Sequence, residues 1–324
     1  EALETNKVQI DYIAGTSMGA VVGALYASGL SAAEVREKLL SVDWNSTLQD
    51  VTDRNERSFR NKSFEGRNFL GLDLGIGPES VRLPLAALRG QKLALALNEL
   101  MLETATVSDF DALPIPFRAM ATDLATGDAV VLGRGSLATA LRASMAVPVV
   151  YSPVGIDGRL YVDGGVANNL PIDVARDMGA DRVIAVDTSS LRYSTNELTS
   201  VVTVVDQLTN LLTRRNTEAQ LEKLTDKDLL IEIFPEGIAT AEFNKAENAL
   251  ALGRESLSAV PDIFSSFAVD SENYATWNNN RSDRDEPPTL AFVEVISDAP
   301  RTSSKTIANR LTVRPGQPLD NERL

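Results

Sequence analysis

A strand, a tight glycine turn and a helix follow one another near the start of the chain. The segment IDYIAGTSMGA, residues 10–20, leads from an apolar stretch into an Ala-rich helical stretch. It contains the G-x-S-x-G pattern of a nucleophile elbow in the strand–turn–helix context that this elbow requires. The turn would present the Ser17 hydroxyl above a helix N-terminus, whose free N–H groups favour negative charge. The segment predicts Ser17 as a nucleophile, within a turn made by Gly15, Thr16, Met18 and Gly19; the alternative is a glycine turn that only packs closely.

Short apolar runs alternate with helical stretches from Val8 to about Phe234. This alternation predicts an α/β fold, with a mainly parallel sheet covered by helices on both faces. The predicted strands are Tyr12–Ala14, Phe117–Asp123, Asp128–Leu132, Arg182–Asp187 and Leu229–Phe234. The predicted helices are Met18–Ser28, Ser31–Ser41, Gln91–Leu102, Leu137–Ser144 and Ile172–Met178.

The chain has no His and no Cys. This composition excludes Ser-His-Asp catalysis, thiol nucleophiles, zinc–thiolate sites and nearly every transition-metal site that needs imidazole. A general base must therefore be a carboxylate, Lys or Tyr, and neither a metal nor another cofactor is expected. Asp plus Glu outnumber Lys plus Arg by 45 to 31, a formal charge of −14, so nucleic acid is not an expected partner.

The best candidate for the base is Asp163, in the segment LYVDGGVANNLP of residues 160–171. A strand would deliver the carboxylate, and Gly164 and Gly165 would let the backbone turn sharply beside it. Burial in an apolar cleft would raise the pKa of the carboxyl group and make it a better base at neutral pH. The alternative is an Asp that caps its own backbone in an Asx turn.

These two motifs together resemble the patatin-like phospholipases, which are serine lipid hydrolases that work with a Ser-Asp dyad. Further segments resemble bacterial members of the family in the expected order, so the resemblance covers roughly residues 1–265. They are residues 117–123, 140–148 and 168–171 and the strand that ends in Asp187. The resemblance implies a three-layer α/β/α sandwich in which Ser17 is the nucleophile and Asp163 the base.

The chain departs from the family pattern at one place. The Gly-rich loop that members carry just before the nucleophile strand has no counterpart in the sequence, and the motif itself supplies only the Met18 backbone N–H as an oxyanion donor. Loss of such donors can cost a factor of ~10²–10³ in rate. Because Glu1–Glu4 has the character of a helix end, we expect the strand and the loop to precede Glu1 in a longer protein; the alternative is a crippled enzyme.

Apolar residues recur at helical spacing between Val201 and Leu212, with Arg214 and Arg215 after them. The commonest role of such a face is core packing. A lipid-docking surface or a dimer contact are the alternatives, and a homodimer is therefore a possible assembly.

The C-terminal part predicts a change of organisation. Residues 271–288 are polar and close with two prolines, which is typical of a linker between a catalytic domain at 1–270 and a unit at 289–324. A strand at Ala291–Ile296, a short helix at Lys305–Leu311 and the segment LTVRPGQPL resemble the start of a POTRA module. This resemblance implies the lipase passenger of an autotransporter. The passenger would be secreted or outer-membrane-associated in a Gram-negative bacterium, followed by a barrel of the same chain; a cytoplasmic location is the alternative.

The expected reaction is acyl transfer from a membrane phospholipid to water through an acyl-enzyme on Ser17, a phospholipase A type of hydrolysis. A lysophospholipase or neutral-lipid esterase with the same dyad, and a non-catalytic lipid-binding passenger, are the alternatives.

Overall fold

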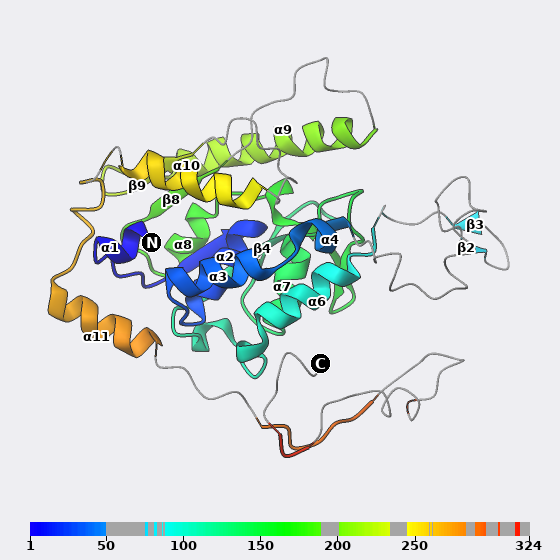
Figure 1. The fold of residues 1–324 in the computed structure, drawn as a ribbon. Helices are drawn as coiled ribbons and strands as arrows, with labels where there is room; N and C mark the ends of the chain where they lie inside the picture. Colours follow the sequence, from blue (N-terminus) through cyan, green and yellow to red (C-terminus); the bar gives the residue numbers. More distant parts are fainter. Residues whose placement is uncertain are drawn as a thin grey trace.

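The computed structural model describes residues 1–49, 75–76, 81–82, 86, 88–188, 201–233, 245–258, 260, 262–282, 289–295, 304 and 315–317. Its centre is a five-stranded sheet with helices packed on it, so the α/β fold is as predicted (Figure 1). The strands of this sheet are β1 (Ile13–Thr16), β4 (Phe117–Asp123), β5 (Ala129–Leu132), β6 (Val154–Ile156) and β7 (Arg159–Asp163).

Strand β4 has three neighbours on its two edges. β5 pairs with residues 119–122 of β4, while β1 pairs with residues 117–120 and β7 with residues 121–123. Because Met120 pairs with both β5 and β1, and Ala121 with both β5 and β7, β1 and β7 share the edge of β4 opposite β5. β1 is parallel to β4 and β7 is antiparallel, so the carboxyl ends of β1 and β7 point toward each other.

The pairing is mixed, which corrects the prediction of a mainly parallel sheet. The β4–β5, β4–β7 and β6–β7 pairs are antiparallel, and the β1–β4 pair and a separate β8–β9 pair are parallel. β8 is Ile184–Asp187, β9 is Leu229–Glu232, and a short antiparallel pair joins β2 (Gly75–Ile76) to β3 (Val81–Arg82). The β6–β7 pair has a local cause, because Asp157 and Gly158 join its two strands with φ angles of 49° and 78°. A two-residue Asp-Gly connection of this kind makes a tight hairpin, whose strands must be antiparallel.

The helices are α1 (Ala2–Thr5), α2 (Met18–Ala27), α3 (Ala32–Ser41), α4 (Trp44–Gln49), α6 (Gln91–Leu100), α7 (Leu137–Ser144), α8 (Ile172–Asp177), α9 (Val201–Leu221), α10 (Ala246–Ser258) and α11 (Ser271–Ser282). α2 lies close against the sheet because Gly23 has no side chain: an added Cβ would stand 2.8 Å from the Ile13 side chain. The main core lies around α2, with Leu25, Phe117 and Leu141 fully buried. None of the helices in the described ranges is both long enough and apolar enough to cross a bilayer.

Helix α11 corrects the prediction of a linker over residues 271–288. Asp270 caps its start, since its carboxylate accepts the backbone N–H groups of Glu272 (3.1 Å) and Asn273 (3.0 Å). Tyr274, Trp277 and Arg281 then recur at helical spacing on one face. Residues 283–288 lie outside the described residues.

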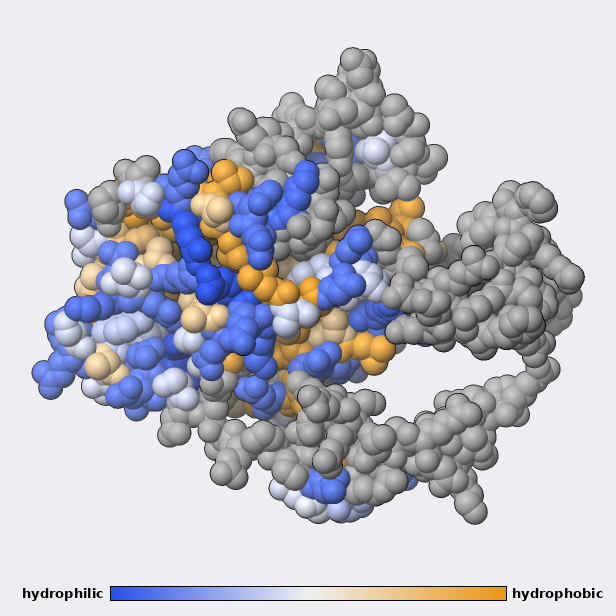
Figure 2. Space-filling model, viewed as in Figure 1, coloured by the Kyte–Doolittle hydropathy of each residue, from blue (hydrophilic) through white to orange (hydrophobic). Residues whose placement is uncertain are grey.

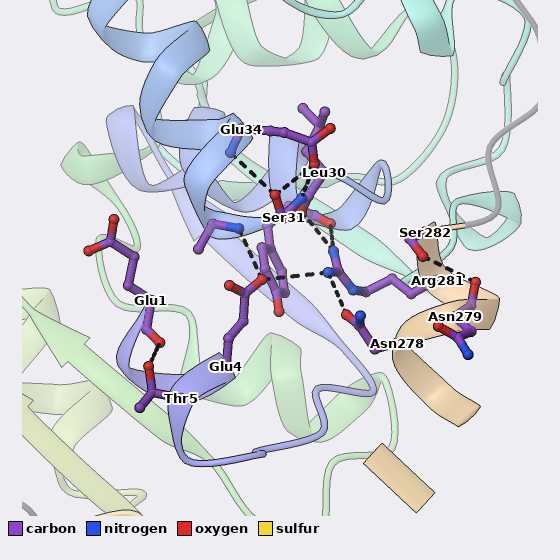
Figure 3. A network of polar contacts seen from close by, with 12 residues as sticks. Glu1, Glu4, Thr5, Leu30, Ser31, Glu34, Asn278, Asn279, Arg281 and Ser282 are labelled. Carbon is purple, nitrogen blue, oxygen red and sulfur yellow. Dashed lines mark hydrogen bonds and ion pairs between the residues drawn. The ribbon is translucent and has the colours of Figure 1, made fainter. Parts of the chain in front are cut away.

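Arg281 fixes α11 to the N-terminal part of the chain. Its buried guanidinium donates to the Leu30 carbonyl oxygen at 2.7 Å and to the Asn278 side chain at 2.9 Å, and pairs with Glu4 at 3.6 Å (Figure 3). The group also lies over the Tyr26 ring, at 4.3 Å from its centroid. Residues 271–282 are polar and nevertheless form a helix, because Arg281 binds to residues more than 250 positions away in the chain.

The predicted unit at 289–324 has little described structure. Residues 291–295 form no strand, against the strand predicted there, while Leu290 exchanges backbone hydrogen bonds with Gly316 and Gln317. The predicted helix at Lys305–Leu311 lies outside the described residues. The POTRA-like module, its barrel, the outer-membrane location and the homodimer stay predictions.

On the face in Figure 2, hydrophilic side chains surround patches of apolar ones.

Candidate active site

The nucleophile elbow is formed as the motif predicts. Ser17 lies between the last residue of β1 and the first residue of α2, with φ 53° and ψ −126°, a conformation that non-glycine residues rarely adopt. Gly15 is required by close packing, because a Cβ there would stand 2.8 Å from the Gly19 carbonyl oxygen. Gly19 itself is not crowded: its added Cβ would meet nothing within 4 Å, so close packing explains only the first glycine of the motif.

Two hydrogen bonds from outside the motif hold the elbow in place. The backbone N–H of Ser17 donates to the hydroxyl of Ser144 at 2.8 Å, and the Thr16 hydroxyl donates to the Asn168 carbonyl oxygen at 2.9 Å. Ser144 is fully buried at the end of α7. No local motif marks Ser144 as a site residue, since its partner is 127 residues away in the chain.

Asp163 is the last residue of β7 and pairs with Ala121, while Thr16 at the end of β1 pairs with Met120. The two strand ends therefore bring Ser17 and Asp163 together across consecutive residues of β4. The backbone of Asp163 is fixed at both ends, because its N–H donates to the Ala146 carbonyl oxygen at 2.9 Å and its carbonyl accepts the Thr122 hydroxyl at 2.9 Å.

The Asp163 carboxylate is buried and has two stabilising partners. Burial raises its pKa to about 6, while the Gly165 backbone N–H and the Ser17 hydroxyl each act to lower the pKa. The Gly165 N–H donates to Oδ1 of Asp163 at 2.8 Å. The carboxylate thus caps its own turn, as the alternative reading of Asp163 states, and also lies against the Ser17 hydroxyl.

The two glycines after Asp163 are explained by close approach. They begin η4, a short 3-10 helix at Gly164–Val166. A Cβ on Gly164 would stand 2.4 Å from the Met120 carbonyl oxygen, and one on Gly165 would stand 3.1 Å from Oδ1 of Asp163. Any side chain at Gly164 would push the turn away from β4 and take Asp163 with it.

Helix α9 holds this turn from the other side, a feature that the sequence analysis missed. Thr213 donates its hydroxyl to the Gly165 carbonyl oxygen at 2.9 Å. The Asn216 side-chain amide donates to the carbonyl oxygens of Gly165 (2.9 Å) and Val166 (3.1 Å) and accepts the Asn169 N–H at 2.9 Å. The only available signal was the helical spacing of these polar residues, which the apolar pattern of the same helix obscured.

The substitution Asn216→Ala is expected to lower kcat for a soluble ester by ~10-fold with little change in KM, because a misplaced catalytic group costs rate rather than substrate affinity. In Asn216→Asp, the new negative charge beside the turn should also raise the pKa of Asp163 and move the acidic limb of the pH–rate profile to higher pH. Glu218→Gln, an exposed change on the same helix, is the control. An unchanged pH profile in Asn216→Asp would contradict this positioning role.

The donors for a developing negative charge are at the start of α2. Ser17 is the N-cap residue of this helix and its side chain does not cap it, so the Met18 N–H has no intrahelical acceptor. Within the described ranges, no three or more Asp and Glu side chains lie together in a way that could hold a metal ion.

Comparison with known proteins identifies the family of this chain. The sequence model of the family described as "Patatin-like phospholipase" matches residues 1–176. An uncharacterised NTE family protein of Mycobacterium tuberculosis is 34% identical over 187 residues, which are 57% of this chain and 43% of that protein. Human patatin-like phospholipase domain-containing protein 6 is 30% identical over 192 residues, 59% of this chain and 12% of that protein. The chain thus spans less than half the length of these relatives.

The alignment with the crystal structure of VipD from Legionella pneumophila covers 87% of this chain and 70% of that chain at 14% identity, with a TM-score of 0.38. The family model matches residues 1–176, a range that includes both the elbow and the turn after Asp163. The chain belongs to the patatin-like phospholipase family.

Proposed function

We propose that this domain hydrolyses the acyl ester bonds of glycerophospholipids, with Ser17 as the nucleophile and Asp163 as the general base. Asp163 accepts the proton of the Ser17 hydroxyl while Oγ attacks the ester carbonyl carbon. The oxyanion forms next to the Met18 N–H at the start of α2. The ester bond then breaks, the departing glycerol oxygen takes the proton from Asp163, and the acyl group stays on Ser17.

Water completes the cycle. Asp163 accepts a proton from water as the water oxygen attacks the acyl-enzyme, and Ser17 leaves with that proton as the fatty acid is released. One carboxylate thus serves as base and as acid in both halves of the reaction.

The observation that carries the proposal is the pair itself: Asp163, buried and fixed by three hydrogen bonds, stands against the hydroxyl of a strained elbow serine. Its pKa of about 6 leaves it mostly ionised at neutral pH, while it is a stronger base than an exposed carboxylate. Family membership supports a lipid ester as the substrate.

The test is fatty-acid release by the full-length protein from phosphatidylcholine vesicles, lysophosphatidylcholine micelles and a triacylglycerol emulsion. Release from the vesicles supports the proposal. Release from only one of the other substrates would replace it with lysophospholipase or neutral-lipid esterase activity. No release, together with no covalent labelling by a fluorophosphonate, would leave a non-catalytic lipid-binding domain.

A further inference from the structure

Helix α9 exposes an apolar row. Val204, Leu208, Leu211 and Leu212 each keep between 41% and 55% of their surface accessible to solvent. The spacing of these residues in the sequence favoured packing in the core. The structure corrects that expectation, because the four side chains are exposed. Single exposed leucines are ordinary on protein surfaces, but a row on one helix is not.

The orientation of α9 is the reverse of the usual amphipathic helix. Its described inward-facing residues are mostly polar: Thr217 and Gln220 are buried, and Thr213 and Asn216 hydrogen-bond the turn after Asp163. Leu221, at the end of the helix, packs against a buried apolar cluster. Leu208 is nine residues from Thr217, and Leu211 nine from Gln220, which at about 100° per residue places each leucine on the opposite side of the helix. The polar side of α9 therefore packs on the domain, and the apolar row faces solvent.

The row is continuous with the proposed active site. Leu212 directly precedes Thr213, whose hydroxyl donates to the carbonyl oxygen of Gly165. The same helix thus contacts the turn that carries Asp163 and bears the apolar row. Figure 1 shows α9 along the upper side of the molecule.

The charge distribution also fits a lipid surface. The stretch Gln207–Thr213 has no charged residue, in a chain with a formal charge of −14, and it is followed by the exposed Arg214 and Arg215. Arginines at the border of an apolar patch can keep their charge at lipid phosphates while their stems lie along apolar surface. Four half-exposed side chains are, in contrast, far short of the ~800 Å² per partner that a stable dimer buries.

We propose that the apolar row of α9 docks the domain on a phospholipid bilayer, with Leu208, Leu211 and Leu212 entering the interface. The proposal rests on the proposed function, because a bilayer is the partner only if its lipids are the substrate. Docking through α9 would place the helix that holds the turn after Asp163 against the lipid.

The test compares the double variant Leu208→Gln/Leu211→Gln with the wild type and with Leu95→Gln, a more exposed leucine on α6. Cosedimentation with phosphatidylcholine vesicles and fatty-acid release from them should both fall at least ~10-fold in the double variant, since two leucines no longer enter the bilayer. Hydrolysis of a soluble short-chain ester should stay within about twofold of the wild type, because the substituted side chains face away from the dyad. Leu95→Gln should bind vesicles as the wild type does.

Unchanged vesicle binding in the double variant would overturn the proposal. A change in oligomeric state on size exclusion with light scattering, without loss of vesicle binding, would also overturn it and assign the row to a second copy of the chain. Failure of the proposed function gives a different pattern: the wild type would then release no fatty acid from any lipid and would not react with fluorophosphonate, whatever its vesicle binding.

Discussion

Replacement of Ser17 by alanine is expected to lower the rate of fatty-acid release by a factor of ~10⁴ or more and to abolish labelling by a fluorophosphonate. Removal of a nucleophile from a serine hydrolase leaves only the catalysis that comes from binding and oxyanion stabilisation. Asp163→Asn should be similarly impaired, because an amide cannot accept the proton of the Ser17 hydroxyl and the chain has no His to replace it. The measurement is initial rates on vesicles and on a soluble ester.

The double variant distinguishes a dyad from two independent contributors. Groups that act as a unit are strongly non-additive, so Ser17→Ala/Asp163→Asn should be about as slow as either single variant. Exposed residues supply matched controls: Ser41→Ala and Asp128→Asn remove the same chemical groups away from the site and should keep full activity. Wild-type rates in Ser17→Ala would contradict the assignment of the nucleophile.

The sequence predicts the elbow around Ser17 and the turn after Asp163, because neighbouring residues in the chain determine both. The elbow needs only residues 13–20, and its glycine and serine pattern is readable because Gly15 must lie against the start of α2. Asp163 could be named because the absence of His leaves a carboxylate next to two glycines as the best base. In both cases the constraint lies within a few residues of the chain.

The supporting groups could not be found in this way. Ser144 and Asn216 act through hydrogen bonds to residues 127 and 51 positions away, and neither stands in a motif. The meeting of β1 and β7 depends on the antiparallel pairing of β7 with β4. The Asp157-Gly158 pair signals only the β6–β7 hairpin, and no local motif signals the pairing of β7 with β4. Similarly, periodicity identified the apolar face of α9 but not the polar contacts that turn this face outward.

Asp163→Asn is also expected to stabilise the protein at neutral pH, although it abolishes activity. The pKa of Asp163 rises from an ordinary 3.8 to about 6 on folding, because burial disfavours the charged form. The folded state therefore holds its proton more tightly than the unfolded state does. Below about pH 3.8, Asp163 does not change the unfolding free energy of the wild type. As the pH rises from there to about 6 this free energy falls, and above about pH 6 it stays at the lower value.

The size of the effect follows from the same two values. A rise from 3.8 to about 6 corresponds to ~3 kcal/mol of unfolding free energy lost at pH 8. Asparagine does not titrate and its side-chain oxygen can still accept the Gly165 N–H, so Asp163→Asn should exceed the wild type by up to this amount at pH 8 and by almost nothing at pH 4. Urea unfolding of both proteins across this range measures the difference, since titration of the other carboxylates cancels.

The same proton sets the acidic limb of the reaction. Wild-type activity should fall as the pH drops through about 6, in the range where the unfolding free energy rises, because the protonated carboxyl group is the stable form and the ionised group is the base. Activity should therefore reach half its maximum near pH 6, where the loss of unfolding free energy that begins near pH 3.8 levels off. If Asp163→Asn lowered the unfolding free energy equally at pH 4 and pH 8, the prediction would be wrong. Asp163 would then stabilise the turn through its hydrogen bonds, and burial of its charge would not destabilise the folded protein.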